Sequence, residues 1–212
     1  MIKNIIFDFD GVVINSMPIR GFGFRKIFEN FDKEQVDKLI EFHNQNGGLS
    51  RFIKIRYFYE SILNSHIGDD EVLKYAEKFS QIMKKMLCNK KILIQDTVDF
   101  ILSNYDKFNM HIVSGSEENE LNFLCKKLEI YKYFKTIQGS PTIKQNILMD
   151  ILDKFSYQKN ETILIGDSIN DYDAAVANKI EFYGFNNIVL KKYSKTYIDS
   201  FKNLDLMQEF GL

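Results

Sequence analysis

Three short segments that are apolar almost throughout constrain the fold of this chain more than any other feature. They span residues 4–9, 110–113 and 162–165, and weaker segments of the same kind span 135–138 and 180–183. A strand in which polar and apolar residues do not alternate is buried on both faces, as in a parallel sheet that is covered by helices. We therefore interpret each segment as a strand of such a sheet.

From about residue 91 onward, the sequence between these predicted strands shows helical periodicity. A helix begins near Ser116, where two glutamates occupy its first turn. The clearest apolar stripe runs along one face of residues 143–155 and consists of Ile143, Ile147, Leu148, Ile151, Leu152 and Phe155. Helices that alternate with buried strands predict an open α/β sheet with helices on both faces.

Residues 16–88 interrupt this alternation. They contain no convincing strand, and their helical runs span 24–31, 33–44, 51–64 and 69–87. We therefore expect two parts: a core made of residues 1–15 and 89–212, and a helical insertion, residues 16–88, that follows the first strand.

Composition excludes several classes of partner. The 28 basic and 29 acidic residues give a net charge of -1, so no broad field attracts nucleic acid or anionic lipid. Cys88 and Cys125 are too few for a disulfide framework or a Cys-X-X-Cys metal site. The apolar run 5–7 is too short for a signal peptide, and no stretch approaches the roughly 20 apolar residues of a membrane span. We expect a cytoplasmic protein without a nucleic-acid or membrane partner.

Two acidic residues stand at the carboxyl end of the first predicted strand. Asp8 and Asp10 are two positions apart, so in a strand they project to the same side. Crowded carboxylates repel one another unless a cation or proton intervenes, and oxygen-rich acidic sites suit Mg²⁺. Taken alone, the Asp-Gly sequence at 10–11 is equally compatible with an ordinary turn.

A second acidic cluster, residues 166–171, directly follows the strand predicted at 162–165. The carboxyl ends of parallel strands border one crevice, so this cluster can meet Asp8 and Asp10, and Asp167 could complete a magnesium site. A loop that leads into a helix capped by an acid would explain the same residues.

Two further segments could hold an anion at this crevice. Ser114, Gly115 and Ser116 follow the strand 110–113 and offer a hydroxyl, an open glycine amide and a helix N-terminus. Lys144 lies in the first turns of the next helix, from which an ammonium could reach the crevice. An ordinary turn and a solvated lysine are the simpler explanations of each segment alone.

With these segments in this order, the chain resembles the haloacid dehalogenase (HAD) superfamily of phosphotransferases over the whole predicted core. The segment Asp8–Val13 is similar to the first motif of the superfamily, Ser114 to the second, Lys144 to the third and residues 166–171 to the fourth. The resemblance implies a Rossmann-like α/β core with an inserted α-helical (C1-type) cap. Within the superfamily, the chain resembles the members that are like phosphoglycolate phosphatase and β-phosphoglucomutase.

The resemblance also implies roles for the acidic residues. Asp8 would attack phosphorus and form an aspartyl-phosphate, while Asp10 would protonate the leaving alkoxide and then take a proton from water. Mg²⁺ would be held by Asp8, Asp10, Asp167 and Asp171, with Asp10 lending its backbone carbonyl and Asp171 acting as a ligand or an anchor. We expect the metal to keep Asp8 anionic, while Asp10 can hold a proton for the first step and act as a carboxylate in the second.

The substrate phosphate would be bound by Ser114, the amide of Gly115 and Lys144, with Asn170 nearby. The implied activity is that of a magnesium-dependent phosphomonoesterase acting on a small phosphorylated sugar, polyol or short acid. Asp10 favours phosphoryl transfer over dehalogenation, which needs no acid for an alkoxide. A phosphoglucomutase-like isomerase would use the same core residues, and a non-catalytic binding protein on this fold is a further alternative.

In the superfamily such an insertion is a mobile cap that closes over the site, so specificity is expected within residues 16–88. Arginine suits bidentate capture of a carboxylate or a second anionic group. The candidates in the cap are Arg20, Arg51, Arg56 and His43, the last at the start of a polar, glycine-ended loop at 43–48. Surface arginines and a helix-terminating turn would explain these residues without any role in binding.

Overall fold

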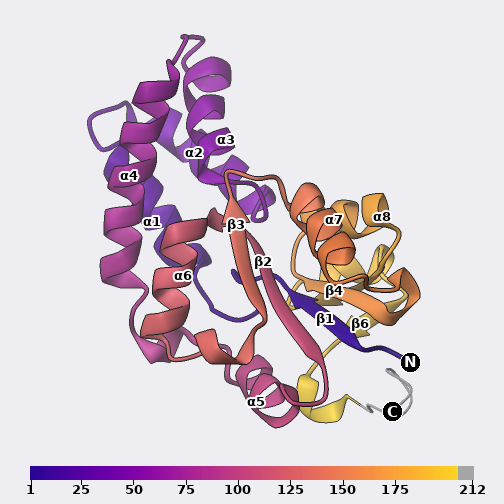
Figure 1. The fold of residues 1–212 in the computed structure, drawn as a ribbon. Helices are drawn as coiled ribbons and strands as arrows, with labels where there is room; N and C mark the ends of the chain where they lie inside the picture. Colours follow the sequence, from indigo (N-terminus) through magenta and orange to yellow (C-terminus); the bar gives the residue numbers. More distant parts are fainter. Residues whose placement is uncertain (205–212) are drawn as a thin grey trace.

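The computed structural model describes residues 1–204 and contains a six-stranded sheet in which every neighbouring pair is parallel (Figure 1). The strand order is β3-β2-β1-β4-β5-β6. The predicted open α/β fold is therefore confirmed. The bounds of the strands are Asn4–Phe7 (β1), Asn109–Glu117 (β2), Thr136–Ser140 (β3), Thr162–Gly166 (β4), Glu181–Phe185 (β5) and Thr196–Ile198 (β6).

The central strands are buried on both faces, as their continuous apolar character predicts. Ile5 belongs to one hydrophobic cluster and Ile6 to the other, because successive side chains of a strand point to opposite faces. The first cluster includes residues of the helices α5 (Gln95–Asn104) and α6 (Glu118–Lys127). The second includes residues of α7 (Lys144–Lys154) and α8 (Ile169–Asn178).

The periodicity at 143–155 correctly predicts α7, whose Ile147, Leu148, Ile151 and Leu152 are buried. Ile143 does not share that face, since it precedes the helix as the N-cap residue and is 53% exposed. Strand β6 was not predicted because its three residues carry no apolar run. Strand β2 extends to Glu117, so the predicted turn at residues 114–116 is part of an irregular strand end.

Four α-helices follow β1, and a fifth, α5, then leads back to the sheet. Figure 1 shows the first four in indigo to purple, with the last of them beside α6. They are packed through aromatic rings, with Phe28 and Phe58 centroids 4.2 Å apart and Phe24 and Phe79 centroids 4.5 Å apart. Their bounds are Met17–Ile27 (α1), Lys33–Gln45 (α2), Arg51–Tyr57 (α3, continued by a π-helical turn, Phe58–Ile62) and Asp69–Met86 (α4).

The helix predicted at 24–31 is displaced in the structure, where α1 begins at Met17 and ends at Ile27. Gly21 and Gly23 are weak helix formers and hid the first two turns, although Pro18 is tolerated there at the start of a helix. The cap and core boundaries at 15–16 and 88–89 stay a prediction. Residues 205–212 of the predicted core lie outside the described residues.

The segment that leaves β1 for the inserted helices runs antiparallel to the segment that returns from them. Ile14 pairs with Leu93, and the amide of Ile94 donates to the carbonyl of Val13 at 2.9 Å. Both cysteines are free thiols. None of the helices within residues 1–204 has the length and apolar character needed to cross a membrane.

Candidate active site

The first acidic segment lies at the carboxyl end of β1, the central strand, as the sequence predicts. The amide of Asp8 donates to the carbonyl of Ile165 at the end of β4, which joins the two motif-bearing strands. Gly11 then turns the chain with φ of +80°, and a Cβ atom there would lie only 1.9 Å from Oδ2 of Asp167. Only glycine permits both this backbone conformation and this close approach.

Asp8, Asp167 and Asp171 form a single carboxylate cluster, with ligand oxygens that all lie within 4.8 Å of one another. Nζ of Lys144 lies 2.9 Å from Oδ1 of Asp8 and also pairs with Asp171. Burial, followed by repulsion from Asp171, raises the pKa of Asp8 from 3.8 to about 7, although Lys144 opposes the shift. Burial and the charge of Asp8 likewise raise the pKa of Asp167.

This cluster fits a divalent cation. Three carboxylates against one ammonium leave two negative charges uncompensated in a buried space, and carboxylate oxygen is the ligand that Mg²⁺ prefers. The carboxylate of Asp10 is not part of the cluster. Its predicted contribution through the backbone carbonyl stays a prediction.

Asp171 also has a structural task. Oδ2 of Asp171 accepts from the Ser168 amide at 3.1 Å and from the Ser168 hydroxyl at 2.7 Å, which forms the capping box of α8. The other oxygen accepts from Lys144. Asp171 thus fixes the start of α8 and the position of Lys144, as the anchor alternative describes.

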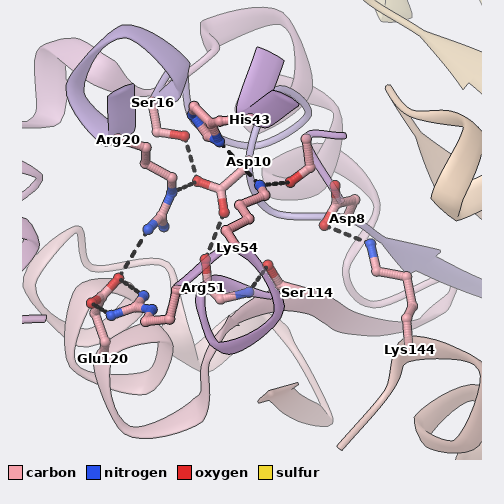
Figure 2. A network of polar contacts seen from close by, with 12 residues as sticks. Asp8, Asp10, Ser16, Arg20, His43, Arg51, Lys54, Ser114, Glu120 and Lys144 are labelled. Atoms are coloured by element: carbon pink, nitrogen blue, oxygen red, sulfur yellow. Dashed lines mark hydrogen bonds and ion pairs between the residues drawn. The ribbon is translucent and has the colours of Figure 1, made fainter. Parts of the chain in front are cut away.

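Asp10 is surrounded by donors instead of carboxylates (Figure 2). Its Oδ1 accepts from the Ser16 hydroxyl and, at 2.5 Å, from Nε of Arg20, while Oδ2 accepts from the Ser116 hydroxyl at 2.6 Å. Burial acts to raise the pKa of Asp10, but Arg20 and these hydrogen bonds outweigh it, so the pKa lies below its ordinary value. These contacts favour the carboxylate form of Asp10, which is the form expected for the second step, and its role as a proton donor in the first step stays a prediction.

A buried glutamate of the core, Glu120 on α6, binds two arginines of the inserted helices. Arg51 forms a two-pronged ion pair with it, at 2.6 Å and 2.8 Å, and Nη1 of Arg20 lies 3.1 Å away. Burial acts to raise the pKa of Glu120, but Arg51 and then Arg20 lower it overall. The chain of contacts Glu120–Arg20–Asp10 connects α6, α1 and the end of β1.

Sequence reasoning missed Glu120, although a signal was present. It precedes Leu121 and Leu124 on the buried side of α6, where an acid needs a cationic partner. Of the predicted cap residues, Arg20, Arg51 and His43 reach the site (Figure 2). The structure does not bring Arg56 there, because it pairs with Asp69 and, at 3.5 Å, with Glu60 within the inserted helices.

The predicted phosphate-binding residues surround the point where the inserted helices meet the sheet. Ser114 is buried on β2, Lys144 begins α7 and Asn170 lies in the first turn of α8. A Cβ at Gly115 would lie 2.3 Å from the carbonyl oxygen of Gly48, and one at Gly48 would lie 2.9 Å from Cβ of Asn170. The glycine-ended loop is thus seated directly on the core residues.

Two cavities adjoin this contact. One of about 320 Å³ is mainly apolar and lies between residues 48–53 and the starts of α7 and α8. The other, which we call the Asp10 cavity, has a volume of only about 20 Å³ and lies beside the loop residues Gly47 and Leu49. Its polar lining side chains are Asp10, Arg20, His43, Arg51, Lys54 and Ser116.

A protein-family model described as haloacid dehalogenase-like hydrolase matches residues 5–185, most of the chain. The chain belongs to this family. The predicted superfamily and the predicted enzyme class, a HAD-type phosphatase, are thereby confirmed.

Individual relatives of this HAD protein are distant in sequence. The phosphoglycolate phosphatase of Pasteurella multocida (strain Pm70) is 22% identical over 180 residues, which are 82% of this chain and 80% of that protein. The β-phosphoglucomutase (pgmB) from Clostridium difficile has a TM-score of 0.79 at 17% identity, covering 98% of this chain and 95% of its own. The HAD-hydrolase YfnB from Bacillus subtilis, bound to magnesium and showing interdomain movement, has a TM-score of 0.73 at 13% identity, with coverages of 100% and 99%.

Proposed function

We propose that this HAD protein is a Mg²⁺-dependent phosphomonoesterase that hydrolyses a small phosphorylated metabolite through an aspartyl-phosphate on Asp8. The observation that carries the proposal is the contrast between two neighbouring carboxylates. Asp8 lies in a cluster that calls for a cation, and Asp10 lies in a separate set of donors that controls its proton. Two carboxylates in opposed environments are the arrangement required for a nucleophile beside an acid–base group.

Asp8 is the nucleophile in this proposal. Its carboxylate is buried, and Lys144 approaches it from the phosphate side of the crevice at 2.9 Å. When bound at Asp8, Asp167 and Asp171, Mg²⁺ would keep Asp8 ionised and offset the charge of the phosphoryl oxygens. Lys144, Ser114 and the Gly115 amide would orient the phosphoryl group for attack in line.

Asp10 moves the protons. As the carboxylate seen here, it can accept a proton from the water that attacks the aspartyl-phosphate. For the first step it needs a proton to give to the leaving oxygen, and a phosphate monoester with a second pKa of about 6 can deliver one. Asp10 gives that proton to the alkoxide, takes one from the attacking water and then releases it to solvent as the product phosphate leaves, so the carboxylate is restored at the end of each cycle.

The inserted helices act as a cap in this proposal. Gly48 lies against Gly115 and Asn170, so substrate enters only when this loop moves away from the core. The interdomain movement described for YfnB supports such an opening. Closure then excludes water from the first step.

Phosphate release from a panel of phosphorylated sugars, polyols and short acids tests the proposal. Wild-type protein should release phosphate only with Mg²⁺, and Asp8→Asn should lower the rate at least about a thousandfold while it still folds. The matched control is Asp150→Asn, an exposed aspartate on α7. Full activity of Asp8→Asn would exclude Asp8 as the nucleophile. NMR of the products would show isomerised sugar phosphate in place of free phosphate if the protein is instead a mutase.

A further inference from the structure

Most cations of the cap that face the active site already have carboxylate partners. Arg20 binds both Asp10 and Glu120, and Arg51 binds Glu120 with two hydrogen bonds. Both guanidinium groups are buried, so these ion pairs are shielded from water and strong. Both guanidinium charges are therefore paired with carboxylates, although Nη2 of Arg20 has no hydrogen-bond partner within residues 1–204.

Lys54 on α3 differs from these arginines. It is only 2% exposed, and its Nζ lies 3.0 Å from Nδ1 of His43 and 3.3 Å from the carbonyl oxygen of Gly47 (Figure 2). Within the described residues 1–204, no carboxylate lies within ion-pair distance of this ammonium. Burial, followed by the charges of Lys54 and Arg20, lowers the pKa of His43 to about 3, so His43 is a neutral partner.

A buried ammonium without a carboxylate is unfavourable unless an anion arrives to pair with it. The Asp10 cavity and its immediate surroundings hold three cationic side chains, Arg20, Arg51 and Lys54, against the carboxylates of Asp10 and Glu120. One positive charge is therefore unbalanced. The pKa of Lys54 agrees with this imbalance, since burial and then Arg20 lower it to about 7.

The leaving group of the substrate must lie in this same cavity, because Asp10 has to reach its oxygen to protonate it. We propose that Lys54 binds a carboxylate on the leaving group, so that the substrate is a small phosphorylated acid and not a neutral sugar or polyol phosphate. The inference rests on the proposed function for this placement of the leaving group. His43 and the Gly47 carbonyl orient the Lys54 ammonium, while Asp10 and Glu120 already neutralise the charges of the two arginines.

The small volume of the Asp10 cavity in this conformation supports a leaving group of few atoms. Its volume of about 20 Å³ is close to that of a single enclosed water molecule. A large leaving group would keep the Gly48 loop away from Gly115, whereas a two- or three-carbon acid needs only a small displacement. Charge and size thus favour the same class of substrate.

The test compares two probes of similar size, 2-phosphoglycolate, which carries a carboxylate, and 2-hydroxyethyl phosphate, which is neutral at that end. Wild-type kcat/KM should favour the carboxylate probe by about 10- to 100-fold, as expected for a buried charge-assisted hydrogen bond. Lys54→Met keeps most of the length of the unbranched side chain and removes its charge, so the ratio should fall to within about threefold of one. The matched control is Lys74→Met, an exposed lysine of α4, which should keep the wild-type ratio.

A wild-type ratio near one would overturn the assignment even if Lys54→Met failed to fold, and so would an unchanged ratio in a folded Lys54→Met. Absence of phosphate release from both probes would instead contradict the proposed phosphatase function. In that case, titration calorimetry of the two probes with Asp8→Asn tests whether Lys54 binds the carboxylate. Tighter binding of 2-phosphoglycolate that is lost in Asp8→Asn/Lys54→Met supports the carboxylate site, and equal binding of both probes refutes it.

Discussion

The candidate active site has two sides of opposite charge, one formed at the end of the sheet (the core side) and one formed by the inserted helices (the cap side). On the core side, three carboxylates around Asp8 share one ammonium, that of Lys144. On the cap side, the cations around Asp10 outnumber the carboxylates. Asp8 and Asp10 are two residues apart, yet burial and Asp171 raise the pKa of the first, while Arg20 and two serines outweigh burial and lower that of the second.

Because their charges are opposite, the two halves of the site need different ligands to become neutral. The core half lacks positive charge, which a divalent cation would supply in the proposed function. The cap half lacks negative charge, which the proposed anionic leaving group would supply. Each half is made of buried groups, and the strength of buried charges makes the division testable by single substitutions.

The largest expected effect follows removal of the carboxylate that joins the two halves. Glu120→Ala leaves two buried arginines without this partner and should lower the free energy of unfolding by about 3–5 kcal/mol. Urea unfolding measures the loss, and Glu77→Ala, at an exposed position of α4, is the control. A loss below about 1 kcal/mol would show that the cap and core are not held together by this cluster.

Magnesium should stabilise the core half. At a concentration of one hundred times its dissociation constant, Mg²⁺ should add about 2.7 kcal/mol to the free energy of unfolding. Asp167→Asn should abolish most of this gain, because Asp167 belongs to the carboxylate cluster. Lys54→Met, on the cap side, should keep it. Equal stabilisation of wild type and Asp167→Asn would place the metal elsewhere.

The stabilisation by Mg²⁺ should also depend on pH. Without metal, the raised pKa of Asp8 means that the folded state binds more protons than the unfolded state between about pH 4 and 7, so this group lowers stability as pH rises through that window. Mg²⁺ replaces the proton and removes the loss. The rise in melting temperature on adding Mg²⁺ should therefore be greater at pH 8 than at pH 5, and a rise that is equal at both would contradict the assignment.

The smallest effect is expected at the surface of the cap. Arg56 pairs with Asp69 and Glu60, but it is partly exposed and all three residues belong to the cap. Arg56→Met should change the free energy of unfolding by less than about 1 kcal/mol, as is usual for exposed ion pairs. The ratio of kcat/KM for the two phosphoester probes should stay at its wild-type value. A large change in that ratio would restore Arg56 as a specificity residue.

The sequence by itself determined the sheet, because continuous apolar runs such as that of β1 are stable only when both faces are covered. It also indicated the meeting of Asp8 and Asp167, since the carboxyl ends of adjacent parallel strands share one edge. The sequence could not show why residue 11 is glycine. The structure gives the physical reason, which is the close approach of Asp167.

Only the tertiary structure decided how the cap meets this edge. Arg20, Arg51 and Lys54 look alike in the sequence as basic residues of helices, and nothing local distinguishes the cation that lacks a carboxylate. Their partners come from other elements of the fold, with Glu120 lying 100 positions after Arg20 and Asp10 ten positions before it. The charge that surrounds a buried group is a sum over neighbours brought together by packing, and for that reason the protonation of Asp10 and the special position of Lys54 emerged only from the fold.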